Sequence, residues 1–105
     1  MTTGPEHTLE HEFELHFTEG FSGETLRVAP ANHIPFELHL KTRLQIGLAH
    51  IEILKLFDRE EVEITIEELG IKHRIFANSR NTIIIFHLTE KALHIEYPTT
   101  RPGYL

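Results

Sequence analysis

With 105 residues, the chain has room for one domain, and its 40% hydrophobic and 25% charged residues are ordinary for a globular protein. The absence of cysteine excludes disulfides, thiolate zinc sites, iron–sulfur clusters and thiol nucleophiles. The net charge of −6 disfavours generic binding to nucleic-acid phosphates. Because the chain has nine histidines, their full protonation would reverse the sign of this charge in the mildly acidic range.

The first 20 residues alternate acidic with hydrophobic side chains and contain no continuous apolar stretch, so they do not resemble a signal peptide. No segment approaches the ~20 consecutive apolar residues that a membrane-spanning helix needs. We therefore expect a cytoplasmic protein that has neither a nucleic-acid nor a membrane partner.

Hydrophobic and polar residues alternate along the first 41 residues, which is typical of half-buried β-strands. In residues 9–17 the hydrophobic side chains share one face, while three glutamates and His16 share the other. A glycine-containing loop over residues 18–24 ends this run. Two prolines then interrupt the next run, and residues 36–41 alternate cleanly again.

The segment 44–57 is ambiguous. Its hydrophobic residues occupy even positions as far as Leu48 and odd positions from Ile51, so the alternation changes phase near Gly47. A β-bulge, or a short turn between two strands, would explain this change. A helix over residues 44–57 is the alternative.

The second half of the chain alternates again over residues 62–67, 71–75 and 93–97. Between them, residues 82–88 (TIIIFHL) are apolar on both faces, which suits a strand that is covered on both sides. The last eight residues include two prolines and a glycine, so they are not expected to form regular structure.

Seven or eight short strands with turns every 8–12 residues predict an all-β fold. We expect a compact antiparallel β-sandwich with Greek-key or jelly-roll-like connections, and a partly open small β-barrel is the alternative. Residues 1–98 would form a single domain, and residues 99–105 an extended C-terminal tail.

The histidines do not have the spacing of a metal site. Neither H-x-H nor H-E-x-x-H occurs, and the closest two histidines are four residues apart, about 13 Å along a strand. We therefore predict no metal site. If a metal were bound, its ligands would be His16, His39 and His94, which otherwise should be solvated on outer faces. His11 and His73 should be half-buried on inner faces.

Side chains for covalent catalysis are scarce. The two serines, Ser22 and Ser79, lie in polar loops outside any nucleophile motif, and no glycine-rich phosphate-binding motif occurs. We therefore predict no catalytic residues and no cofactor, so the protein should not be an enzyme. Binding of carbohydrate by exposed aromatic side chains is an alternative function, although the chain lacks tryptophan.

The strand at 82–88 and the C-terminal tail carry more apolar surface than a single small sandwich can cover. We therefore predict a non-enzymatic interaction or structural domain that self-associates, as a homodimer, or binds another protein. The interface residues would be Ile83, Ile85, Tyr104 and Leu105. One alternative is that the tail folds back over its own sheet. Another is a histidine-based metal-binding or metal-dependent domain.

Overall fold

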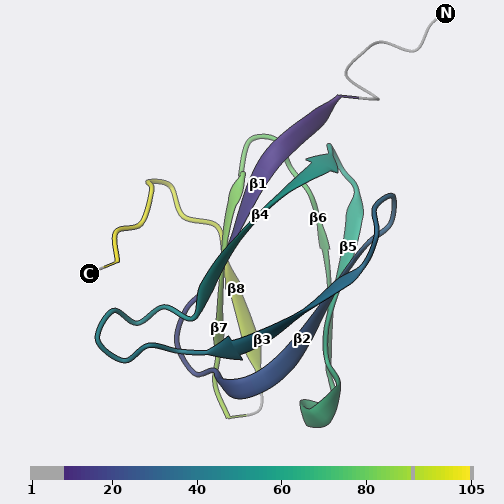
Figure 1. Cartoon of the computed structure of the whole chain (residues 1–105). Coiled ribbons are helices and arrows are strands. Elements are labelled where there is room, and N and C mark those ends of the chain that lie inside the picture. The colour runs from purple at the N-terminus through teal and green to yellow at the C-terminus, as the bar shows by residue number, and fades with distance from the viewer. Residues whose placement is uncertain (1–8, 91, 105) are drawn as a thin grey trace, which may run out of the picture.

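The computed structural model describes residues 9–90 and 92–104, which form two packed four-stranded sheets (Figure 1). Sheet A contains, in spatial order, β4 (His50–Phe57), β1 (Glu10–Phe17), β7 (Ile83–Leu88) and β8 (Leu93–Glu96). Sheet B contains β3 (Phe36–Lys41), β2 (Ser22–Pro30), β5 (Glu61–Ile66) and β6 (Ile71–Phe76). The predicted β-sandwich of seven or eight strands is therefore confirmed, with eight strands in two sheets.

The described residues contain one short 3₁₀-helix, η2 (Glu67–Leu69), between β5 and β6. None of their helices is long and apolar enough to cross a membrane.

Five of the strand pairs within the described residues are antiparallel, and β1 pairs with β7 in parallel. Sheet A is therefore mixed, because β1 lies between an antiparallel neighbour, β4, and a parallel one, β7. A parallel pair needs a long crossover. Here the connection from β1 to β7 contains all four strands of sheet B and also β4 of sheet A.

The hydrophobic core lies between the inner faces of the two sheets. The odd-numbered residues of β1 and the even-numbered residues of β7 point into it, and the rings of Phe17 and Phe86 stack with their centroids 4.9 Å apart. Phe21 packs edge-on against Phe17. Each large side chain buried in this way contributes roughly 1.5–3 kcal/mol to stability. The alternating pattern therefore fixes which face of each strand is inside.

The ambiguous segment resolves into a turn followed by a strand. Residues 44–47 form the turn, closed by a hydrogen bond from the Arg43 backbone N–H to the Leu48 carbonyl, and β4 begins at His50. Gly47 has the positive φ angle that such a turn requires. The turn explains the change in phase, and the alternative of a helix over residues 44–57 is wrong.

Candidate functional site

The outer face of sheet A carries an unusual number of isoleucines. Glu14 on β1 lies level with Ile53 on β4 and with Ile83 on β7. One step along the strands, His16 lies level with Ile51 and Ile85. We call the surface formed by these four residues the "isoleucine face": Ile51, Ile53, Ile83 and Ile85. Ile53 is 56% exposed, and Ile83 and Ile85 are half-buried.

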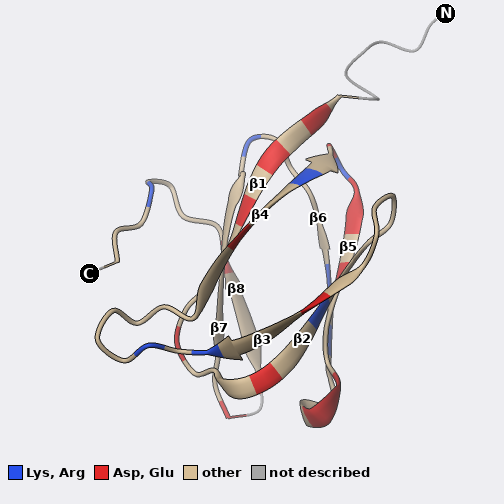
Figure 2. Cartoon of the chain, in the orientation of Figure 1, with Lys and Arg blue, Asp and Glu red and all other residues tan. Residues whose placement is uncertain are grey.

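The outer face of sheet B is polar by comparison. Its central strands present threonine and arginine side chains, and its edge strand β6 carries Arg74, which pairs with Glu61 at 2.9 Å. Phe76, at the end of β6, is the large exposed hydrophobic residue on this face. Figure 2 shows acidic residues on strands of both sheets, so the presence of acidic residues does not distinguish the two sheets. What distinguishes them is the row of isoleucines on sheet A.

A buried polar pair lies in the middle of the isoleucine face. His16 is only 1% exposed although it points away from the core, and its Nε2 lies 2.9 Å from Oε1 of Glu14. Its Nδ1 lies 2.9 Å from the Tyr104 hydroxyl. A neutral imidazole protonated at Nε2 satisfies both bonds, since Nε2–H donates to Glu14 and Nδ1 accepts from the tyrosine O–H. The expectation that His16 would be solvated is therefore wrong.

The C-terminal tail covers this pair. Arg101 donates two hydrogen bonds to Glu14, at 3.0 Å to Oε1 and 2.7 Å to Oε2, and Tyr104 bonds to His16. In Figure 1 the tail lies on the side of the molecule away from β5 and β6. The hydrogen bonds from Arg101, and then the one from His16, lower the pKa of Glu14 to about 2. Glu14 is therefore ionised at any physiological pH. We call Glu14 and His16 the "tail site".

A second histidine network joins the start of β1 to two loops at one end of the sandwich. His33, in the β2–β3 loop, places Nδ1 2.9 Å from Glu60 and Nε2 2.5 Å from Glu10. The buried carboxylate of Glu60 also accepts the backbone N–H groups of Asn32 and Phe57. Because every described partner in this network is another carboxylate or a backbone group, its arrangement favours a structural role over nucleophilic catalysis.

The structure does not bring the three candidate metal ligands together. His39 lies on the outer face of sheet B, hydrogen-bonded to Thr25, whereas His16 and His94 lie on sheet A with β7 between their strands. His94 instead stacks on its cross-strand neighbour His87, with ring centroids 4.7 Å apart. Within residues 9–90 and 92–104, no three histidine or acidic side chains are grouped to hold a metal ion.

The four predicted interface residues fall in one region as far as the structure describes them. Ile83 and Ile85 point outward from β7, and Tyr104 reaches the tail site. Leu105 lies outside the described residues. Sequence reasoning missed Glu14, His16 and Arg101 as one cluster, since nothing local in residues 101–104 indicates which strand the tail covers.

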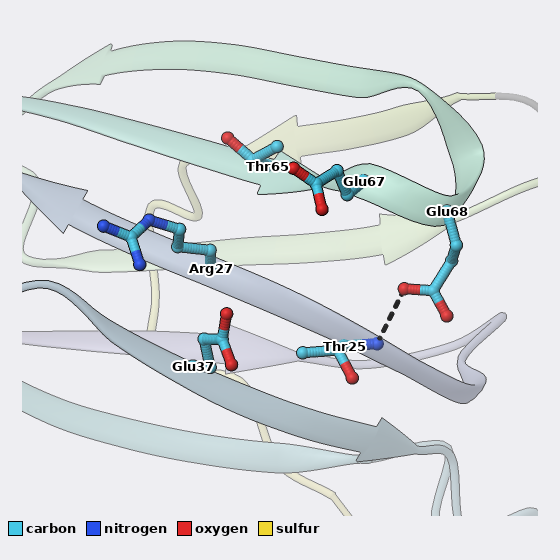
Figure 3. Close-up of a pocket in the computed structure, with 6 residues that line it drawn as sticks. All are labelled: Thr25, Arg27, Glu37, Thr65, Glu67 and Glu68. Atoms are coloured by element: carbon cyan, nitrogen blue, oxygen red, sulfur yellow. Dashed lines mark hydrogen bonds between the residues drawn. The ribbon is translucent and has the colours of Figure 1, made fainter.

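A shallow hollow lies on the outer face of sheet B (Figure 3). Its lining is polar and comprises Thr25, Arg27, Glu37, Thr65, Glu67 and Glu68. The Glu68 carboxylate accepts the backbone N–H of Thr25 at 3.1 Å, while the Arg27 guanidinium points away from Glu67 and Glu68. Three carboxylates spread around an open hollow have the character of a solvated surface.

The exposed aromatic rings do not form a platform for a sugar. Phe76 ends β6 on sheet B, whereas Tyr97 follows β8 on sheet A, so these two exposed rings belong to different sheets.

No known protein family, characterised protein or solved structure matches this chain.

Proposed function

We propose that the protein is a non-enzymatic interaction domain that associates with a second copy of itself through the outer face of sheet A. The observation that supports this proposal is the isoleucine face, set against the polar outer face of sheet B in the same molecule. The outer face of a sheet in a two-layer sandwich normally meets water and is polar. Isoleucine side chains gathered at such a position typically mark an interaction site, even where a polar pair lies between them.

The edge of sheet A supports the same proposal. Strand β4 has eight residues and is the longest of the four edge strands, since β3 and β6 have six each and β8 has four. Edge strands are usually protected by charged side chains, as β6 is by Lys72 and Arg74. Strand β4 instead presents Ile51 and Ile53 on its outer side, with a single lysine, Lys55.

A second copy is the partner that suits the charges around the patch. A two-fold interface must be complementary to itself, so charges that lie in it must include both signs. Lys55 on β4 lies level with Glu12 on β1, and both side chains are exposed. A two-fold axis near Ile53 would let each of these residues face its opposite in the second copy, around a centre formed by isoleucines.

The test compares two matched charge insertions. Ile53 on β4 is 56% exposed and Phe76 on β6 is 57% exposed, and both lie on edge strands. Sedimentation velocity at about 100 μM should show a dimer for the wild type and for Phe76→Glu, but a monomer for Ile53→Glu. A monomeric wild type would overturn the proposal. Equal dimerisation of the two variants would show that sheet A is not the interface.

A further inference from the structure

The C-terminal tail is fastened to the sandwich by side chains. The hydrogen bonds from residues 97–104 to the rest of the described chain come from Arg101, to Glu14, and from Tyr104, to His16. Within the described part, these residues form no strand and no backbone hydrogen bond to either sheet. The tail is thus held by two side chains three residues apart, and not by backbone pairing with a strand.

The tail site is a built receptor for those two side chains. Glu14 offers both carboxylate oxygens to one guanidinium, the bidentate geometry that arginine suits best. His16 is buried, so its Nδ1 needs a hydrogen-bond donor, and the hydroxyl of Tyr104 supplies one. The site therefore recognises a segment with arginine and tyrosine three residues apart.

This receptor lies inside the surface that we propose to bury between two copies. Glu14 and His16 are flanked by Ile51 and Ile53 on one side and by Ile83 and Ile85 on the other. A second copy that approaches the isoleucine face therefore meets the tail. While the tail is held within its own chain, Ile51, Ile53 and Tyr97 are still exposed, so it does not complete this face.

We propose that, in the self-associated protein, the two copies exchange their C-terminal tails, so that each tail binds the tail site of the other copy. This inference rests on the proposed self-association. The exchange keeps the Arg101–Glu14 and Tyr104–His16 bonds unchanged, while the residues that connect each tail to β8 run across to the other copy and so join the two copies. Exchange of an identical segment is a low-cost route to a dimer because it needs no new recognition.

The connection between β8 and the tail suits such an exchange. Tyr97 and Pro98 follow the end of β8, and Pro98 has no backbone N–H to lose when the segment changes direction. No backbone hydrogen bond of the described structure ties residues 97–100 to the sheets. The tail can therefore be redirected to a neighbouring copy without breaking a strand pair.

Charge reversal in two full-length chains tests the exchange. Glu14→Lys places a lysine against Arg101 within one chain, and Arg101→Glu places a glutamate against Glu14 within the other, so neither chain can bind its own tail. In the mixture, the unchanged tail of the Glu14→Lys chain matches the unchanged Glu14 of the Arg101→Glu chain, and the reversed tail matches the reversed site. We expect each variant alone to be monomeric at about 100 μM and their equimolar mixture to form a heterodimer, which native mass spectrometry identifies by mass. The double variant carrying both changes should dimerise like the wild type and shows that the substitutions are compatible with folding.

A second measurement uses the unmodified chain, in case Glu14→Lys does not fold. A mixture of isotope-labelled and unlabelled wild-type protein should show isotope-filtered NOEs between the Tyr104 ring of one copy and the His16 ring of the other. A wild-type dimer whose tail NOEs arise only within a chain would overturn the exchange and leave the proposed function standing. So would two folded variants that stay monomeric when mixed. A monomeric wild type would overturn both.

Discussion

The Nδ1 atom of His33 lies 2.9 Å from a carboxylate oxygen of Glu60, whose side chain is completely buried. The other ring nitrogen of His33 contacts Glu10, so one imidazole lies between two carboxylates. The hydrogen bond to Glu10, and then the one to Glu60, raise the pKa of His33. This arrangement links the start of β1, the β2–β3 loop and the β4–β5 turn.

The first prediction concerns pH. Because the folded pKa of His33 is above its unfolded value, its contribution is fully present below the unfolded pKa of about 6.5. It is lost as pH rises through the folded pKa. Urea unfolding of wild type and His33→Gln should therefore show an advantage for the wild type that shrinks as pH is raised from about 6 to 9. An advantage that stays constant or grows over this range would contradict the prediction.

The second prediction concerns Glu60. Glu60→Ala removes the buried carboxylate that accepts the part-buried backbone N–H groups of Asn32 and Phe57, and it also removes a partner of His33. We expect the free energy of unfolding to fall by about 2–4 kcal/mol. The neighbouring Glu61→Ala is the control, because Glu61 makes only a partly exposed pair with Arg74 and should cost less than about 1 kcal/mol. Chemical denaturation of both variants gives the comparison, and equal losses would contradict it.

The sequence predicts the layers of this fold well because alternation is a local property. In β1 it identifies Phe13, Leu15 and Phe17 as core residues, and all three are buried. Alternation carries no information about which strands pair or in which direction. The parallel pairing of β1 with β7 therefore appears only in the structure.

For the candidate site, too, local patterns predict which side chains face outward but not which distant segment covers them. The two-sided apolar pattern of residues 82–88 correctly indicates that the outer side of β7 is partly covered, since Ile83 and Ile85 are half-buried. The pattern also places His16 on an outer face, which is correct, but it cannot show that Tyr104 lies over this histidine. A contact between residues 88 positions apart depends on the path of the tail, which no local pattern in the tail specifies.

The third prediction concerns acid. The folded pKa of Glu14 is about 2, below its usual value of 4.5, so the Arg101 pair contributes stability above the unfolded pKa and loses it as pH falls toward 2. Arg101→Met should lower the free energy of unfolding only slightly at pH 7, since Arg101 is largely exposed and solvent screens its pair with Glu14. The difference from wild type should shrink below pH ~4.5.

Denaturation at one fixed protein concentration checks this, because association changes the apparent stability. Arg74→Met is the matched control, as it removes an arginine–glutamate pair between two more exposed side chains. If the Arg101→Met difference were as large at pH 2.5 as at pH 7, ionised Glu14 would not be its source.

The fourth prediction concerns the turn between β1 and β2. Gly20 has a φ of 93°, and a Cβ atom added there would lie 1.6 Å from the backbone oxygen of Leu88, at the end of β7. Gly20→Ala must therefore shift the backbone, and we expect it to lower the free energy of unfolding by about 3 kcal/mol or more.

Gly23 is the control. It shares the left-handed φ, at 113°, but no atom lies within 4 Å of a Cβ added there. Gly23→Ala should lower the free energy of unfolding by only about 1 kcal/mol, the cost of a left-handed φ for a residue with a Cβ atom. Thermal unfolding of the two variants separates steric overlap from backbone strain, and a Gly20→Ala protein as stable as Gly23→Ala would show that β7 does not approach this turn so closely.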